Sequence, residues 1–220
     1  MGTDNLFHKR KARKARDLAR RKGRRAPYDK VLIVCEGEKT EPHYFNELKD
    51  HYGLNSANIE ICGDCGSDPL SIIHYAKKRY RAERDAGDAF DKVFCVFDKD
   101  THANYQQGLD EIRRATPKDV YVAITSVPCF EYWLLLHFKY TTRPYGQMEG
   151  NSACNQVITD LKEYMPKYTK GNTGIFPELL GQLDFAKKNA EHALQHATNT
   201  LTDNPTTKVH EILTFMENIK

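Results

Sequence analysis

The chain has 220 residues, with 33 Lys and Arg against 30 Asp and Glu and a hydrophobic content of 40%. This length allows one sizeable core with an appendage, and the composition is typical of a soluble globular protein. The longest apolar stretch, around 133–138, is far too short for a membrane span, and the basic N-terminus lacks the apolar core of a signal peptide. We therefore expect a cytoplasmic protein with no membrane partner.

The net charge of +3 conceals a basic N-terminal arm. Residues 1–30 hold twelve Lys and Arg against three Asp, so they carry +9 and leave −6 for the remaining chain. The arm, residues 1–29, has almost no large apolar side chains, so we expect it to be mobile when free. Such a run can neutralise phosphates, which favours nucleic-acid binding. A solubilising tail or a contact for an acidic protein partner is the alternative. The expected contacts are Lys9, Arg10, Lys11, Arg13, Lys14, Arg20, Arg21, Lys22, Arg24 and Arg25.

Strand and helix patterns alternate over residues 30–140. Apolar runs at 30–36, 58–62, 91–98 and 120–127 predict strands, and the segments between them predict helices from about residue 40, over 69–87 and over 104–115. Thr40 is the expected N-cap of the first helix, with Glu41 and Pro42 in its first turn. Runs with few polar interruptions are typical of a mostly parallel sheet covered on both faces. The sequence therefore predicts an α/β fold with four strands.

The pattern changes to helices over residues 141–220, and we expect these helices to form a cap packed on the α/β body. The six cysteines are interpreted as free thiols, because Cys35 and Cys95 lie in apolar strand-like runs. Cys62 and Cys65 have metal or redox spacing. With no second pair nearby, we favour two incidental thiols in a loop over a metal site.

Acidic residues directly follow two of the buried-type strands. Glu36 ends the first, and Asp98 and Asp100 end the third, with Lys99 between them pointing the other way. The carboxyl ends of parallel strands meet at one edge of a sheet, where ligands bind. Carboxylate oxygens suit Mg²⁺ or Mn²⁺, which support phosphoryl transfer. Solvated loop acids and helix caps explain these residues equally well.

These acids and their surroundings resemble known proteins. "VCEG" after the first strand and "VFDKD" after the third resemble the Glu and Asp-x-Asp motifs of the Toprim fold. The runs "LIVCEGEKTEPHYF", "FDKD", "SVPCFEYWLLLHF" and "NPTT" are together similar to the RloB-like family, Toprim proteins associated with phage defence and abortive infection. This resemblance covers nearly the whole chain from Lys30 onward.

The resemblance implies roles for particular residues. Glu36, Asp98 and Asp100 stand at the metal-binding positions, with Glu36 also implicated in proton transfer. Glu131 in "PCFEYW" fits a later acid of related nucleases, with a helix-start acid as its alternative. Their second glutamate follows the first by four residues, whereas Glu41 follows Glu36 by five, so Glu41 and Glu38 compete for that position.

Other polar residues are secondary candidates. Lys39 and Lys99 could hold a phosphate, and Lys170 could approach the active edge from the cap together with Tyr168, Asn204 and Thr206. Satisfied structural histidines are the favoured interpretation of His43, His102 and His137, with His102 the best exception because it follows "DKDT". "NPTT" is explained by a helix cap. Trp133, Phe130 and Phe138 are expected in the core.

The leading hypothesis is a Mg²⁺- or Mn²⁺-dependent nuclease that cleaves RNA, tRNA included, or DNA. Glu36, Asp98, Asp100 and Glu131 would bind metal, Glu41 would assist, and the arm with Lys39 and Lys170 would hold the nucleic acid. The family association implies a partner ATPase encoded alongside. The alternative is a non-catalytic module that binds nucleic acid or a nucleotide and regulates that ATPase.

Overall fold

A five-stranded sheet forms the centre of the protein in a computed structural model that describes residues 29–56, 58–66, 68–99 and 102–219. The strand order is β2-β1-β3-β4-β5. Strands β1 (Val31–Cys35), β2 (Ile59–Cys62), β3 (Lys92–Asp98) and β4 (Tyr121–Val127) are parallel, and β5 (Thr206–Thr207) runs antiparallel to β4. The predicted α/β fold with a mostly parallel sheet is confirmed. The arm contacts predicted within residues 1–28, and Asp100, lie outside the described residues.

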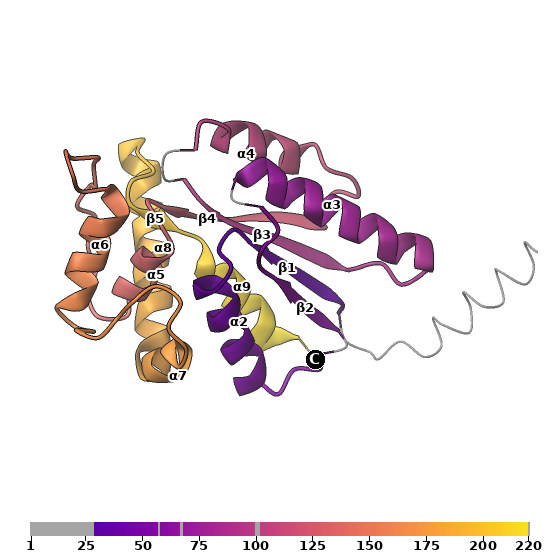
Figure 1. Ribbon diagram of the computed structural model, residues 1–220, viewed down its shortest axis with the longest axis horizontal. Coiled ribbons are helices and arrows are strands. Elements are labelled where there is room, and N and C mark those ends of the chain that lie inside the picture. The colour runs from indigo at the N-terminus through magenta and orange to yellow at the C-terminus, as the bar shows by residue number, and fades with distance from the viewer. Residues whose placement is uncertain (1–28, 57, 67, 100–101, 220) are drawn as a thin grey trace, which may run out of the picture.

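Helices cover both faces of the sheet (Figure 1). One face carries α3 (Pro69–Ala86) and α4 (Tyr105–Arg113), and the other carries α2 (Thr40–His51) and α9 (Val209–Asn218). The remaining helices lie beyond the end of β4 (Figure 1). They are α5 (Glu131–Leu135), α6 (Ala153–Lys162), α7 (Ile175–Leu179), the 3₁₀ helix η1 (Leu180–Gln182) and α8 (Leu183–Thr200).

Burial explains why the apolar runs form the inner strands. All five residues of β1 are fully buried. Val31, Ile33 and Cys35 pack towards α2 and α9, whereas Leu32 and Val34 pack towards α3 and α4, as the alternation of side chains along a strand requires. Burying each Val, Leu or Ile side chain contributes about 1.5–3 kcal/mol, so this strand is held from both sides.

The helices that follow β4 share the core on the α2 face. Trp133 of α5 is fully buried, and its Nε1 donates a hydrogen bond of 2.9 Å to the Tyr44 hydroxyl of α2. Phe130 is buried beside it, which confirms the expectation for both aromatics. Phe138 is half-buried and stacks on Tyr164, with ring centroids 5.2 Å apart. The aromatic cluster therefore ties α5 to the sheet layer.

The chain forms one strand that the sequence did not predict. Thr206 and Thr207 of "NPTT" pair with Val127 and Ser126 at the end of β4. The hydroxyl oxygens of Ser126 and Thr207 also lie 3.0 Å apart. A strand of two residues has no periodicity to recognise, so the segment resembled only a helix cap. The cap interpretation survives in part, because the Val209 N–H donates to the Thr207 hydroxyl at 3.3 Å.

The N-cap predicted for the first helix is shifted by one residue. Thr40 is the first residue of α2, and Lys39 precedes it without a side-chain cap. The Thr40 hydroxyl instead accepts a hydrogen bond of 2.9 Å from the N–H of Gly171, which belongs to the loop before α7. The Thr40 side chain therefore makes a tertiary hydrogen bond instead of capping its own helix.

The interpretation of all six cysteines as thiols is wrong for two of them. Cys129, two residues after β4, and Cys154, in the first turn of α6, form a disulfide. Their Cα atoms lie 5.6 Å apart although 25 positions separate them. Cys35, Cys62, Cys65 and Cys95 are free. The pairing depends on how α6 packs against α5, which no local pattern reveals.

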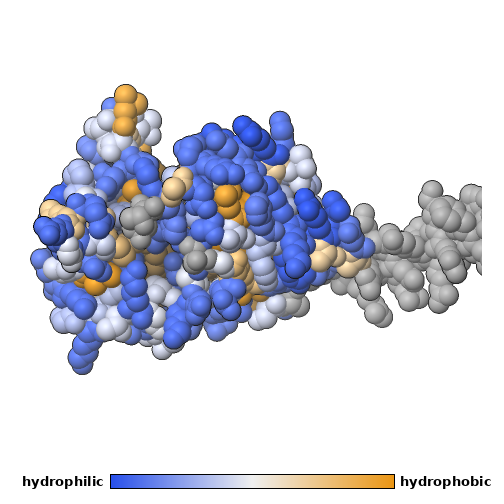
Figure 2. Space-filling model, turned by 45° about the horizontal axis from the view of Figure 1, so that its top comes forward, coloured by the Kyte–Doolittle hydropathy of each residue, from blue (hydrophilic) through white to orange (hydrophobic). Residues whose placement is uncertain are grey.

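The described surface is largely hydrophilic. Figure 2 shows hydrophilic residues over most of one face, with hydrophobic residues in small separate groups. Leu201 is the most exposed of the large hydrophobic residues, at 95%. None of the described helices is both long and apolar enough to cross a membrane.

Candidate metal site

Glu36 is held against β3 by the continuation of the sheet beyond β1. Its N–H donates to the Val96 carbonyl at 3.0 Å, which extends the β1–β3 ladder by one residue. One carboxylate oxygen, Oε2, accepts a hydrogen bond of 3.0 Å from the N–H of Asp98. The two strand-end acids are therefore neighbours, although 62 positions separate them in the chain.

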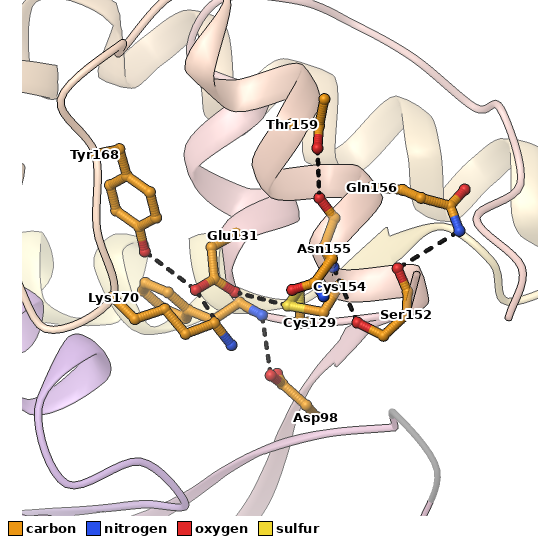
Figure 3. The surroundings of a disulfide bond; sticks show 11 residues. Asp98, Cys129, Glu131, Ser152, Cys154, Asn155, Gln156, Thr159, Tyr168 and Lys170 are labelled. Atoms are coloured by element: carbon orange, nitrogen blue, oxygen red, sulfur yellow. Dashed lines mark hydrogen bonds and ion pairs between the residues drawn. A yellow bond between two sulfur atoms is a disulfide. The ribbon is translucent and has the colours of Figure 1, made fainter. Parts of the chain in front are cut away.

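Asp98 is the last residue of β3 and its carboxylate points towards the start of α5. Its Oδ2 accepts a hydrogen bond of 3.1 Å from the N–H of Phe130 (Figure 3). Lys99 points elsewhere and forms an ion pair of 2.6 Å with Asp203, as the alternation along a strand predicted. Lys99 is therefore paired with an acid elsewhere, whereas the Asp98 carboxylate lies on the same side as Glu36.

Glu131 reaches the same cluster from the first position of α5. It is buried, and its Oε1 accepts a hydrogen bond of 3.1 Å from the Tyr168 hydroxyl. Lys170 Nζ lies 3.5 Å from this oxygen, and Cys154 Sγ lies 3.3 Å from Oε2 (Figure 3). Glu131 is therefore the first residue of a helix, and its carboxylate is also buried against Tyr168.

The structure places Glu41, rather than Glu38, among the buried acids. Glu41 lies in the first turn of α2 and is buried, whereas Glu38 is exposed. Gly37 permits this approach, because a Cβ on Gly37 would overlap the Glu41 carboxylate. Sequence reasoning did not single out Gly37, although a glycine directly after a strand-end acid is a signal of close packing.

Mutual repulsion and burial favour the protonated forms of two of these acids. Burial is the main cause that raises the pKa of Glu41 to about 7, with Glu131 and Glu36 adding to it and Lys170 opposing it. Burial also raises the pKa of Asp98 well above its usual range, and Glu41, Glu131 and Glu36 raise it further. A cation would relieve both effects, since an opposite charge favours the ionised carboxylates.

The acids line a cavity of about 400 Å³ at the carboxyl edge of the sheet. Glu36, Glu41, Asp98 and Glu131 contribute from four separate segments, and the exposed Glu38 lies on its wall together with Lys39 and Lys170. Four carboxylates with oxygen ligands only are the donor set that Mg²⁺ and Mn²⁺ prefer. This donor chemistry suits a hard divalent cation, and because no three of these acids in the described chain have carboxylate oxygens within 4.8 Å of one another, the side chains would have to move closer to share one ion.

A loop of the C-terminal region is anchored on α2 and carries Lys170 to the cavity. Gly171 bonds to Thr40 through its N–H, and its carbonyl oxygen lies 3.2 Å from His43 Nδ1. Further along, Glu47 accepts hydrogen bonds from the N–H groups of Gly174 and Phe176, at 2.5 and 3.0 Å. These bonds hold the loop in place, so the position of Lys170 is set by α2.

The three histidine candidates have different surroundings. His102 Nε2 lies 2.6 Å from Glu36 Oε1, so His102 belongs to the site. His43 contacts the Gly171 carbonyl, and His137 is buried, with burial lowering its pKa to about 4. His43 therefore has a structural partner, whereas His137 Nε2 has no hydrogen-bond partner among the described residues, so the expectation of a satisfied histidine is wrong for His137. His102 is the one of these three that contacts an acid of the cavity.

Two further candidates from the C-terminal region lie outside the cavity. Asn204 bonds to the backbone of Tyr145, and the Thr206 hydroxyl donates to the Asp203 carbonyl. Cys129 and Cys154, which sequence reasoning did not place here, are in contact with the site through Glu131.

Comparison with known proteins gives one family match. The family model described as "RloB-like protein" matches residues 31–216, which is most of the chain. No curated protein and no solved structure matches. The matched range includes Glu36, Glu41, Asp98 and Glu131 and ends within α9. The chain therefore belongs to the RloB-like family.

Proposed function

We propose that the protein is a Mg²⁺- or Mn²⁺-dependent nuclease that hydrolyses phosphodiester bonds in RNA, tRNA included, or DNA. The observation that carries this proposal is the contact between Glu36 Oε2 and the Asp98 N–H, 3.0 Å long, which joins two strand ends into one acid cluster. Glu41 and Glu131 are the buried acids that line the same cavity. The resemblance to Toprim enzymes, which use such acids to bind metal, points the same way.

Each residue of the cluster has a role that its contacts support. When bound, the metal would activate a water molecule and stabilise charge on the scissile phosphate. Glu36 and Asp98 bind it, and Tyr168 orients Glu131 through the hydrogen bond to Oε1. His102 Nε2 lies 2.6 Å from Glu36 Oε1, so this imidazole is placed to exchange a proton with a reacting oxygen at the site.

Lysine side chains at the rim of the site can bind the phosphate groups of the substrate. The Lys170 side chain is 57% exposed although its Nζ lies 3.5 Å from Glu131, so it can reach a phosphate outside the cavity. Lys39 is also exposed at the cavity, beside Gly171. The basic arm would add sequence-independent affinity for the nucleic-acid backbone. These groups position a phosphodiester over the acids without reading its bases.

The test is cleavage of labelled RNA and DNA by the purified protein with Mg²⁺ or Mn²⁺. We expect fragments from the wild type, and a loss of at least about a hundredfold in Asp98→Asn and Glu36→Gln, since both remove a proposed ligand of the metal. Glu149→Gln, which neutralises an exposed acid outside the cavity, is the matched control. Equal cleavage by Asp98→Asn and the wild type would refute the proposal.

A non-catalytic binding module is the second candidate. The observation that favours it is the pair between Lys170 and Glu131, because an ammonium group can balance acidic charge where an enzyme would use a metal. In that case the edge would hold a nucleic acid or a nucleotide and regulate a partner ATPase. It predicts that the wild type cleaves neither RNA nor DNA, and that Asp98→Asn keeps the biological effect.

The biological setting proposed for the nuclease follows from the family resemblance. It would act in the cytoplasm as the effector of an anti-phage abortive-infection system, restrained by a partner ATPase that senses infection. Unregulated cleavage would harm the host cell. Expression with and without the ATPase, followed by sequencing of the cleaved nucleic acids, tests this setting. Cleavage that is independent of both the ATPase and infection would contradict it.

A further inference from the structure

The disulfide between Cys129 and Cys154 is in direct contact with the proposed metal site. Cys154 Sγ lies 3.3 Å from Glu131 Oε2, and the two sulfurs and this carboxylate lie within 4.8 Å of one another. All three residues are buried. Figure 3 shows the disulfide on the side of Glu131 away from Tyr168 and Lys170. The proposed function uses Glu131 but gives the sulfur pair no part.

We propose that Cys129 and Cys154 are a site of reversible oxidation, and that their redox state sets how strongly the acid cluster binds its cation. This inference rests on the proposed metal site. The co-reactant is a low-molecular-weight thiol or dithiol, and the oxidised pair is the form that favours binding.

The first reason is the hydrogen bonding of Glu131. Its Oε1 already accepts from the Tyr168 hydroxyl at 3.1 Å. In the disulfide, the Cys154 sulfur carries no proton, so it offers nothing to Oε2. In the reduced protein, the Cys154 thiol can donate to Oε2 at the same place, 3.3 Å away. Glu131 would have to give up or share this added hydrogen bond to bind a cation, so its binding would be weaker than in the oxidised protein.

The second reason is the position of the disulfide in the chain. Cys129 is followed directly by Phe130, whose N–H holds Asp98 Oδ2 at 3.1 Å, and then by Glu131. The disulfide ties this short segment to the first turn of α6. Reduction removes that tie and loosens two contacts of the acid cluster at once. Both reasons predict that the reduced protein binds the cation more weakly than the oxidised protein.

The exchange reaction balances without a further cofactor. A thiolate attacks one sulfur, the Cys129–Cys154 bond breaks, and the released thiolate takes up a proton. A second thiol then displaces the protein from the mixed disulfide, so two thiols are oxidised as the pair gains two electrons. Cys154 is 6% exposed and follows a loop, 141–152, whose residues are mostly exposed. Opening of that loop would give a small thiol access.

The test compares Mn²⁺ binding by the full chain in its two redox states. One sample is reduced with dithiothreitol, which is then removed without air, and the other is oxidised with glutathione disulfide. Alkylation followed by mass measurement counts the thiols, and calorimetry measures the Mn²⁺ affinity. We expect binding about tenfold weaker in the reduced wild type, the scale of changes in the surroundings of metal ligands.

Two variants complete the design. Cys129→Ser removes the disulfide but keeps the Cys154 thiol, so its affinity should stay at the weak value under both treatments. The double variant Cys62→Ser/Cys65→Ser removes the two half-buried free thiols elsewhere in the chain and should retain the tenfold difference. Circular dichroism verifies that each variant is folded.

The outcomes separate the inference from the proposed function. Equal affinity in two wild-type samples whose thiol counts differ by two would overturn the redox inference and leave the metal site standing. Equal thiol counts in the reduced and the oxidised sample would overturn it as well. If neither state binds Mn²⁺, the metal site itself is refuted and the inference is refuted with it.

Discussion

Replacing Gly37 with alanine tests the packing that brings Glu41 to the acid cluster. A Cβ at this position would lie 3.0 Å from Glu41 Cδ and 3.2 Å from Oε1, and closer still to Oε2. The contact with Oε2 is shorter than a Cβ tolerates, so the buried carboxylate would have to move. The backbone of Gly37 does not adopt a positive φ, so the effect is confined to this overlap.

The magnitude follows from the cost of overpacking a buried site. An extra methyl group without room costs about 1–3 kcal/mol. For a chain of this length, about 2–4 °C in melting temperature corresponds to each kcal/mol, so we expect Gly37→Ala to melt roughly 2–12 °C below the wild type. Displacement of Glu41 should also weaken Mn²⁺ binding about tenfold.

The assay combines thermal melting with Mn²⁺ titration. Gly146→Ala is the matched control, because a Cβ there meets nothing within 4 Å and its φ is not positive. It should melt and bind Mn²⁺ like the wild type. If Gly37→Ala also behaves like the wild type, Glu41 does not occupy the position described and has no part in the site.

Three further changes have clear expected outcomes. Because the pKa of Glu41 is raised from 4.5 to about 7 in the folded protein, its contribution to stability is present below about pH 4.5 and is lost as the pH rises through 7. The melting temperature of the metal-free wild type should therefore fall between about pH 5 and pH 8, and this fall should be smaller in Glu41→Gln. The same dependence of melting temperature on pH in both proteins would contradict the raised pKa of Glu41. Lys170→Met should weaken binding of a short oligonucleotide roughly fivefold, or about 1 kcal/mol for one exposed ion pair, as measured by fluorescence anisotropy. Lys167→Met, in the same exposed loop, should not, and equal losses in both variants would exclude a specific role for Lys170. Trp133→Phe should lower the free energy of unfolding in urea by about 1–3 kcal/mol, because it removes ring volume and the hydrogen bond to Tyr44, and an unchanged value would show that this contact adds no stability.

The sheet and the meeting of its strand-end acids could be predicted from the sequence. Continuous apolar runs such as Val31–Cys35 are typical of strands buried on both faces, and parallel strands have their carboxyl ends at one edge. That geometry brings Glu36 to Asp98 whatever the details of the loops. Glu131 could be placed only through the family resemblance, since nothing local indicates which way the first side chain of a short helix points.

Features that depend on the packing of the C-terminal region could not be predicted. The pairing of Thr207 with Ser126 and the disulfide of Cys154 both join segments that only the folded chain brings together. Thr40 shows the same limitation, because its hydroxyl bonds to a distant N–H instead of capping its own helix. Local propensity describes the alternatives open to a side chain, and tertiary contacts select among them.

Direct measurement of Mn²⁺ binding to metal-free protein, by calorimetry or electron paramagnetic resonance, tests the central claim that Glu36 and Asp98 share a cation. We predict saturable binding by the wild type and a loss of at least about tenfold in affinity for both Asp98→Asn and Glu36→Gln. Glu149→Gln should bind like the wild type. Wild-type affinity in the Asp98→Asn protein would contradict the claim.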